Sequence, residues 1–239
     1  MSALAVVQAR VSSTRLPGKV LAEVGGEPML ALELRRLRGA RRLDDIVVAT
    51  STRADDDPVA ELATGLGVRL HRGPLEDVLG RFAGAAAEHD GIVVRITGDC
   101  PLIDPAVVDA VVDLLEAAPD AVYASNVEPR RTFPHGLDVE ALRAATLAQL
   151  DREVTDPELR EHVTLAARRD PDRYPAVAVE NDEDLSHLRW TVDLPADLEF
   201  VRAVADRLGT DRHVAGWRDI LAAARREPSL AEVGGRRRA

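Results

Sequence analysis

A polar loop near the N-terminus carries the first residues that could do chemistry. The stretch QARVSSTRLPGKVL (residues 8–21) contains the cations Arg10, Arg15 and Lys19, and no acidic residue interrupts them. Guanidinium groups hold phosphate oxygens in pairs, and an ammonium adds a compact point charge. Backbone N–H groups and hydroxyls can complete such a site, and the hydroxyls here belong to Ser12, Ser13 and Thr14. The loop therefore predicts a phosphate cradle, with an ordinary solvated surface loop as the alternative.

Lys19 is the only lysine of the chain, although Lys and Arg together number 31. A planar guanidinium and a slim ammonium are not interchangeable where space is tight. We infer that the position after the Pro-Gly turn requires the shape of lysine as well as its charge.

Two common nucleotide-binding fingerprints are absent from this loop. A Walker A loop needs Ser or Thr after Gly-Lys, but Val20 follows Lys19, and Ser13 stands where the first glycine belongs. No G-x-G-x-x-G follows the first predicted strand. The pattern thus argues against a P-loop NTPase and against a dinucleotide-binding site.

Two carboxylates follow predicted strands elsewhere in the chain. Asp99 lies in RITGDCPLIDP and Asp193 in RWTVDLPADLEF. Carboxylates at strand ends could share a divalent cation, as transfer onto phosphate usually requires; turn-forming carboxylates are the alternative. Asp104 precedes a proline and is interpreted as a helix N-cap. Cys100 has no evident partner base and is interpreted as a packing residue.

Composition limits the class of protein. The chain has 239 residues, 46% of them hydrophobic, which suffices for one large core. A net charge of −10 argues against a nucleic-acid partner. No apolar run is long enough to cross a membrane, and no signal peptide is evident, so we expect a cytoplasmic protein. A single cysteine excludes an internal disulfide.

The elements that must position these residues begin with a βαβ series. Buried strands are predicted at 4–9, 44–51, 68–71 and 91–97, and helices at 29–40, 57–65, 74–89 and 106–118. Alternation of strand and helix indicates a mostly parallel sheet. The polar loops after residues 9 and 97 leave strands at its carboxyl edge, where ligands bind.

The regular alternation of strand and helix ends after residue 120. Strands are predicted at 120–127, 136–142, 175–180 and 188–193, and helices at 142–152, 157–169, after Pro195 and at 215–226. We expect a single domain over 1–239 with an inserted lobe at about 125–180. The last residues, 231–239, are expected to form a flexible tail.

Together these stretches resemble a known family. QARVSSTRLPGKVL, DDIVVATS, HRGPLEDVLGR, VVRITGDCPLIDP, FPHGLDVEAL, REHVT and LSHLRWTVDLPADLEFV occur in the order found in spore coat polysaccharide biosynthesis cytidylyltransferases. These are relatives of the CMP-KDO and CMP-sialic acid synthetases. The resemblance spans about residues 4 to 230, and the opening loop and G-D-C-P-L are its most specific parts.

The resemblance implies an α/β fold of the nucleotide-diphospho-sugar transferase type. This fold is a Rossmann-like three-layer α/β/α sandwich whose mostly parallel sheet carries a small inserted β lobe, usually in a homodimer. The implied activity is Mg²⁺-dependent transfer of CMP from CTP to a sugar acid or related acidic acceptor, with release of pyrophosphate. Activated-sugar, polysaccharide or secondary-metabolite biosynthesis would use such a product.

The resemblance also assigns roles to residues of this chain. Asp99 and Asp193 would hold magnesium, and with Arg15 and Lys19 they form the implied catalytic set. The implied nucleotide-binding residues are Ala9, Arg10, Ser12, Ser13, Thr14, Arg15, Lys19, Arg72, Asp77, Gly98 and Asp99. The implied acceptor-binding residues are Arg95, Arg131, His135, Asp138, Glu161 and His162. Solvated helix faces or structural salt bridges are the alternative for the weaker candidates, which are Arg72, Asp77, Arg81, Arg131, His135, Asp138, Glu161 and His162.

At two positions the chain departs from the pattern of the family. Ser12 stands where many members have glycine, and Leu165 where proline is common.

A glycosyltransferase would need a D-x-D metal motif, which Asp55 and Asp57 match formally; we interpret this acidic run as capping charge at a helix start. A non-catalytic nucleotide-binding relative should have lost Lys19 or a metal carboxylate, and the chain keeps them.

Overall fold

The first strand is buried on both of its faces, which places it in the middle of the molecule. In β1 (Ala3–Gln8), Ala3, Ala5 and Val7 join one apolar cluster, while Leu4 and Val6 join another. A strand with both faces buried belongs to a sheet covered by helices on each side. The computed structural model describes residues 1–226, so the tail predicted at 231–239 lies outside the described residues.

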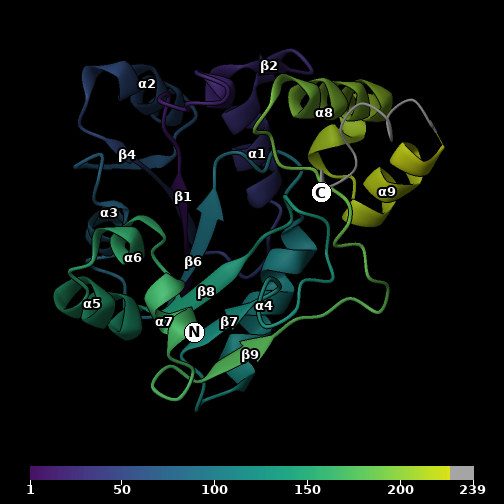
Figure 1. Cartoon of the computed structure of the whole chain (residues 1–239). Helices are drawn as coiled ribbons and strands as arrows, with labels where there is room; N and C mark the ends of the chain where they lie inside the picture. Colours follow the sequence, from purple (N-terminus) through teal and green to yellow (C-terminus); the bar gives the residue numbers. More distant parts are fainter. Residues whose placement is uncertain (227–239) are drawn as a thin grey trace.

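Seven strands form the main sheet in the order β5-β4-β1-β6-β8-β7-β9 (Figure 1). After β1 they are β4 (Asp45–Ser51), β5 (Arg69–Gly73), β6 (Ile92–Thr97), β7 (Tyr123–Ser125), β8 (Glu140–Arg143) and β9 (Ala176–Ala178). A separate short hairpin pairs β2 (Glu23–Val24) with β3 (Glu27–Pro28). The helices are α1 (Met29–Leu37), α2 (Asp57–Gly65), α3 (Val78–Ala85), α4 (Pro105–Ala117), α5 (Ala144–Glu153), α6 (Pro157–Glu161), α7 (Leu165–Arg169), α8 (Pro195–Leu208) and α9 (Trp217–Arg225).

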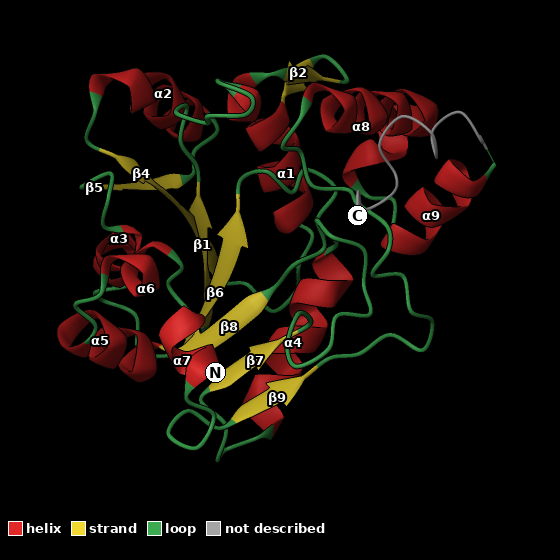
Figure 2. Cartoon of the chain, in the orientation of Figure 1, coloured by secondary structure: helices red, strands yellow, loops and turns green. Residues whose placement is uncertain are grey.

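Helices cover both faces of the sheet and make three layers (Figure 2). Apolar residues of α1, α2, α4, α8 and α9 pack with one face of the sheet, and those of α3, α5 and α7 pack with the other. The predicted α/β sandwich with a mostly parallel sheet is confirmed by this arrangement.

The parallel part of the sheet brings two loops to one edge. β1 pairs in parallel with β4 and with β6, and Gln8 lies opposite both Ala49 and Thr97. The carboxyl ends of β1 and β6 are therefore level, and their arrows point to the same edge in Figure 1. The loops that follow Gln8 and Thr97 leave the sheet side by side.

The antiparallel part extends the same sheet. β8 runs antiparallel to β6 and to β7, and β9 pairs in parallel with β7. The segment predicted as an inserted lobe at 125–180 thus supplies β8 and β9 to the main sheet.

Two predicted elements were wrong. The helix predicted at 157–169 is divided into α6 and α7 by a turn in which Val163 has a φ of 50°. The strand predicted at 188–193 makes one isolated bridge, between Arg189 and His135. Its backbone instead bonds to loops, since Val192 N–H donates to Asp99 O at 2.9 Å. Its apolar pattern reflects burial of Trp190 and Val192 between those loops, which periodicity alone cannot distinguish from a strand.

None of the helices in the described residues has the length and apolar character needed to cross a membrane.

Candidate active site

The cationic loop after β1 is held in one shape by its own backbone. Val11 O accepts hydrogen bonds from Ser13 N–H at 2.8 Å and from Gly18 N–H at 2.9 Å. Gly18 has a φ of 73°, a conformation that residues with a side chain rarely adopt. This turn directs the chain into a 3-10 helix at Lys19–Leu21.

The Lys19 side chain leaves the loop and enters the protein. The residue is 8% exposed, and its ammonium donates to Asp99 Oδ2 at 2.8 Å, to Val192 O at 2.7 Å and to Asp193 Oδ1 at 2.9 Å. Three acceptors match the three N–H donors of an ammonium. The contacts explain why a compact cation stands here, because a planar guanidinium does not fit the same three-way arrangement.

The two carboxylates that bind this ammonium come from segments that are far apart in the sequence. Asp99 follows β6, where Gly98 N–H donates to Gln8 O at 2.8 Å. A Cβ on Gly98 would lie 3.0 Å from Gln8 O, so glycine permits the close approach of the two loops. Asp193 precedes α8, and its N–H donates to Asp197 Oδ2 at 2.9 Å. The carboxylates that the sequence could not place together thus meet at Lys19.

Positive charge surrounds Asp193. Arg15 Nη2 lies 2.8 Å from Asp193 Oδ1, and Arg189 pairs with the other carboxylate oxygen. Burial raises the pKa of Asp193, but hydrogen bonds from Lys19 and Arg189 outweigh it and lower the net pKa below its ordinary value. Burial likewise lowers the pKa of Lys19, yet Asp99 and Asp193 outweigh it and raise the net pKa. Both groups therefore carry their charges at neutral pH.

The donor set at this position suits magnesium. In residues 1–226 no cluster of three or more His, Cys, Asp or Glu side chains could enclose a metal ion. Mg²⁺ is commonly bound by one or two carboxylates together with substrate phosphates and water. Asp99 and Asp193 supply two carboxylates that already bind one shared cation, the Lys19 ammonium. The residues present therefore fit a magnesium ion that is shared with a nucleotide.

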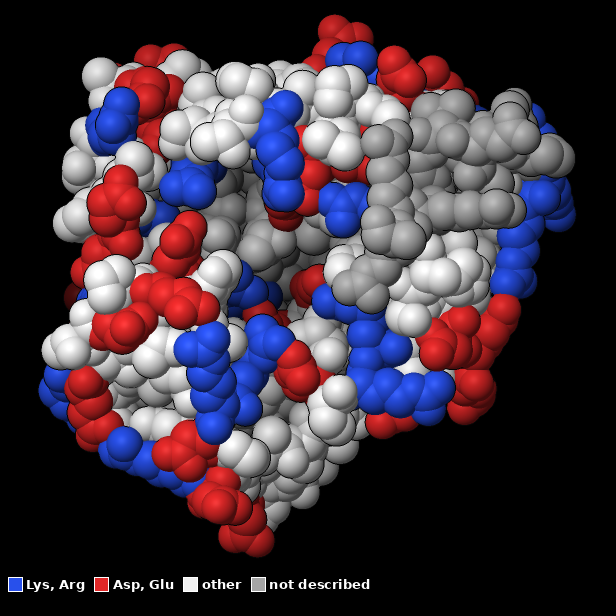
Figure 3. Space-filling model, in the orientation of Figure 1, with Lys and Arg blue, Asp and Glu red and all other residues white. Residues whose placement is uncertain are grey.

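A cavity opens between the loop and these carboxylates. It contains most of the predicted nucleotide-binding residues, and its lining is Gln8, Ala9, Arg10, Ser13, Thr14, Arg15, Lys19, Val20, Thr97, Gly98, Asp99 and Asp193. Figure 3 shows basic and acidic side chains around a central hollow on this face of the molecule. Gln8 and Thr97 were not predicted; both end strands directly before the two site loops, which is the signal that could have found them.

Three predicted nucleotide-binding residues lie outside that lining. Ser12 belongs to the loop but not to the cavity wall. Arg72 donates to Ser51 O at 2.8 Å and pairs with Asp57. Asp77 caps α3 through Gly80 N–H and pairs with Arg160 at 2.8 Å. The last two side chains are thus engaged in contacts within the protein.

A second cavity adjoins the first and shares Thr97 with it. It contains four of the predicted acceptor-binding residues, and its lining is Arg95, Thr97, Val127, Glu128, Pro129, Arg131, Asp138, Glu140, His162 and Arg168. Arg131 Nη2 donates to Asp138 Oδ2 at 2.9 Å, and Arg168 pairs with Glu128. This cavity therefore presents guanidinium groups that are already oriented by carboxylates.

Glu140 organises the wall of the second cavity. It is 4% exposed and accepts hydrogen bonds from Tyr123 Oη at 2.7 Å and Thr164 Oγ1 at 2.6 Å, besides pairing with Arg95. Burial raises the pKa of Glu140, but Arg95 and Thr164 outweigh it and lower the net pKa. Glu140 was not predicted, although a charged residue within an apolar strand is a detectable signal.

Two predicted acceptor-binding residues do not line the second cavity. The backbone of His135 pairs with the segment around Arg189, where Trp190 N–H donates to His135 O at 2.6 Å. Glu161 is exposed at the end of α6. Arg168 does line the cavity and was missed, because a run of arginines on a short helix is also typical of a solvated surface.

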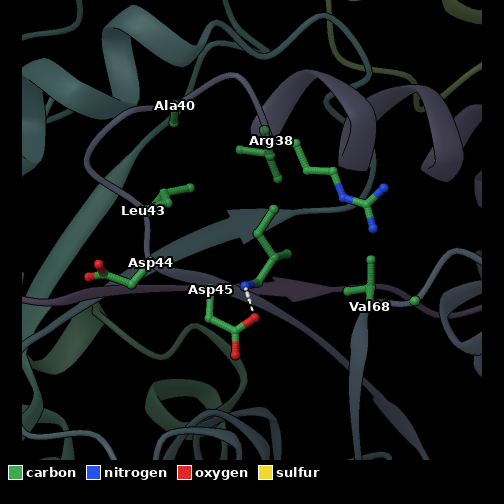
Figure 4. Close-up of a pocket in the computed structure, with 9 residues that line it drawn as sticks. Arg38, Ala40, Leu43, Asp44, Asp45 and Val68 are labelled. Atoms are coloured by element: carbon green, nitrogen blue, oxygen red, sulfur yellow. Dashed lines mark hydrogen bonds between the residues drawn. The ribbon is translucent and has the colours of Figure 1, made fainter.

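Another pocket lies at the amino end of β4 (Figure 4). Its carboxylates have partners in the protein, since Asp44 accepts from Ala3 N–H and Asp45 pairs with Arg69, each at 2.8 Å. It is lined by the amino end of a strand, away from the loops described above. We assign it no chemistry.

Comparison with known proteins identifies the class. Residues 4–207 match the family model described as Cytidylyltransferase, and the chain belongs to this family. The spore coat polysaccharide biosynthesis protein SpsF of Bacillus subtilis is 30% identical over 237 residues, which cover 95% of this chain and 96% of SpsF. A 3-deoxy-manno-octulosonate cytidylyltransferase of Zea mays is 38% identical over 130 residues, or 52% of this chain and 42% of that one.

Solved structures of cytidylyltransferases are similar to this chain. A cytidylyltransferase from Leptospira borgpetersenii superposes with a TM-score of 0.92 at 29% identity, covering 100% of this chain and 99% of its own. A CMP:2-keto-3-deoxy-manno-octonic acid synthetase, solved in complex with CTP, gives a TM-score of 0.67 at 21% identity, covering 86% of this chain and 99% of its own. The nucleotide-diphospho-sugar transferase fold and the family resemblance are both confirmed.

Proposed function

We propose that this protein transfers CMP from CTP to an acidic, sugar-like acceptor and releases pyrophosphate. Family membership supports CMP transfer from CTP. The observation that carries the proposal is the placement of Lys19 between Asp99 and Asp193, directly beside the cationic loop. Such a centre combines a cradle for phosphates with two carboxylates for their metal ion.

The triphosphate occupies the first cavity. Arg10 and Arg15 face its oxygens together with backbone N–H groups and hydroxyls of the loop. Arg15 is 64% exposed along its side chain and reaches Asp193, so it can exchange that partner for a phosphate oxygen. Phosphoryl transfer depends on positioning and on charge stabilisation more than on a protein nucleophile.

The acceptor occupies the second cavity. Because the two cavities share Thr97, an acceptor in the second cavity lies beside a nucleotide in the first, and its hydroxyl attacks the α-phosphate as pyrophosphate leaves. Arg95, Arg131 and Arg168 suit an anionic group on the acceptor, since guanidinium recognises carboxylate bidentately. The buried Glu140 keeps Arg95 in place.

Magnesium held by Asp99 and Asp193 would neutralise charge that develops on the phosphate oxygens. Lys19 orients both carboxylates through its hydrogen bonds. A homodimer, which the family resemblance implies, and a cytoplasmic location, which the sequence pattern predicts, are part of the proposal.

A pyrophosphate-release screen tests the function. Each of four nucleoside triphosphates is mixed with Mg²⁺ and a panel of sugar acids, sugar phosphates and phosphonates. The proposal predicts release with CTP and an acidic acceptor, accompanied by a CMP conjugate in the mass spectrum. Binding of CTP without product from any acceptor would instead favour a non-catalytic relative. No pyrophosphate release, together with consumption of a nucleotide sugar supplied in a parallel assay, would favour a glycosyltransferase.

A further inference from the structure

Asp56 differs from both neighbours in the acidic run Asp55-Asp56-Asp57. Asp55 pairs with Arg53 at 3.0 Å, and Asp57 pairs with Arg72 at 2.7 Å, both near the surface. Asp56 is 1% exposed. Asp56 is the N-cap residue of α2, so its charge stands at a helix start as expected, but its side chain makes no cap bond to that helix. A buried carboxylate needs another reason to be there.

Its partners lie at the start of the phosphate loop. Asp56 Oδ1 accepts a hydrogen bond from Val11 N–H at 2.7 Å, and Oδ2 accepts one from Ser51 Oγ at the end of β4. Val11 O is the acceptor for both Ser13 N–H and Gly18 N–H. The carboxylate therefore fixes the amide of Val11, the residue whose carbonyl oxygen accepts the internal bonds of the loop.

The charge of Asp56 also reaches a neighbouring loop. Arg81 is 3% exposed and donates to Leu75 O at 2.7 Å and to Pro74 O. Burial and Arg10 lower the pKa of Arg81, while Asp56 opposes them. The Asp56 carboxylate therefore stabilises the charge of Arg81 as well as binding the start of the phosphate loop.

We propose that Asp56 is a positioning residue for nucleotide binding, acting through the amide of Val11. It holds the phosphate loop in its binding shape before the triphosphate arrives, and this lowers the ordering cost of binding. Asp56 itself touches no ligand. The inference rests on the proposed binding of CTP in the first cavity.

The test uses four substitutions in the full chain. Asp56→Ala removes the acceptor. Asp56→Asn keeps an oxygen for Val11 N–H without the charge, whereas Asp56→Glu keeps the charge but displaces the oxygen. Asp55→Ala is the matched control from the same acidic run. Calorimetry measures the Kd for CTP with Mg²⁺ and no acceptor, and hydrogen exchange of residues 9–18 is followed without nucleotide.

We expect Asp56→Ala and Asp56→Glu to weaken CTP binding about 10-fold or more and to speed exchange in the loop. Asp56→Asn should stay within about 3-fold of wild type, and Asp55→Ala should match wild type. If Asp56→Ala does not fold, the comparison of Asn with Glu decides. Equal binding by all variants, or better binding by Glu than by Asn, overturns the inference.

The two proposals fail separately. If wild type binds no CTP, the proposed function fails, and exchange in residues 9–18 still shows whether Asp56 orders the loop. If wild type binds CTP and Asp56→Ala binds it equally well, the inference about Asp56 alone fails.

Discussion

The Lys19 ammonium lies 2.9 Å from Asp193 Oδ1, although the two residues are 174 positions apart in the chain. This contact joins the turn after the phosphate loop to the start of α8. It also changes the interpretation of the only lysine. Lys19 is predicted to bind the triphosphate, and the structure adds a second role, since its ammonium is held by two carboxylates. Its shape matters because it fills a buried position with three acceptors.

Replacement of Lys19 should abolish efficient turnover even when charge is kept. Lys19→Ala and Lys19→Arg are each expected to lower kcat/KM about 100-fold, comparable to loss of one preorganised donor in a reaction centre. Lys19→Arg fails because the larger guanidinium displaces Asp99 or Asp193. Steady-state pyrophosphate release measures the effect, with the exposed Arg35→Lys as control. Wild-type activity in Lys19→Arg would make the lone lysine an accident of composition.

Glu140 should stabilise the fold in a pH-dependent way. Its folded pKa is below the ordinary value, so its stabilisation is full above pH about 4.3 and is lost as pH falls through the folded pKa. Glu140→Gln is expected to cost about 3 kcal/mol at pH 7, since it leaves Arg95 without its buried partner. The difference should shrink below pH about 4 in urea denaturation.

The control for this experiment is Glu153→Gln, which removes an exposed partner of Arg173. It should leave stability unchanged, as exposed ion pairs contribute little. A difference between Glu140→Gln and wild type that stays constant from pH 3 to pH 7 contradicts the prediction.

Glu33 should show the opposite dependence on pH. It is fully buried in α1, and burial together with the charge of Asp99 raises its pKa well above the ordinary value. Above pH about 4.3 the unfolded chain loses this proton while the folded protein keeps it. Wild type therefore loses stability as pH rises toward the folded pKa. Glu33→Gln removes this slope, and its stability relative to wild type should increase between pH 4 and pH 7. An equal slope in both proteins argues against a neutral Glu33.

Arg131 should separate acceptor use from nucleotide binding. It lines the second cavity and does not line the first. Arg131→Ala is expected to leave the Kd for CTP with Mg²⁺ unchanged while lowering product formation about 100-fold. The exposed Arg130→Ala serves as the neighbouring control. Loss of CTP affinity in Arg131→Ala, or full product formation, is inconsistent with an acceptor role.

The strands in the parallel half of the sheet were predicted correctly, because the signal lies within each strand's own residues. The strands β1, β4 and β6 are short β-branched runs bounded by polar loops, and both of their faces are buried. The same reasoning failed at 188–193, where burial between loops imitates a strand. It also failed at Val163, whose positive φ has no signature in residue type.

Site residues were predictable where they follow a strand and not where a partner decides their role. Asp99 and the cationic loop could be found because parallel strands end at one edge. The contact of Asp56 with Val11 was not predicted, because only the fold brings its carboxylate to that amide. Glu140 was missed because its partners Tyr123 and Thr164 come from distant segments.

In the proposed function, Asp99, Asp193 and Lys19 form the reaction centre for cytidylyl transfer. This assignment is tested most directly by single-turnover pyrophosphate release from saturating CTP with Mg²⁺ and the acceptor found in the screen. Wild type is compared with Asp193→Asn, and with Asp113→Asn at an exposed site. We predict that Asp193→Asn is slower by about 100-fold or more, while Asp113→Asn equals wild type. Equal rates for wild type and Asp193→Asn would show that Asp193 is not part of the reaction centre.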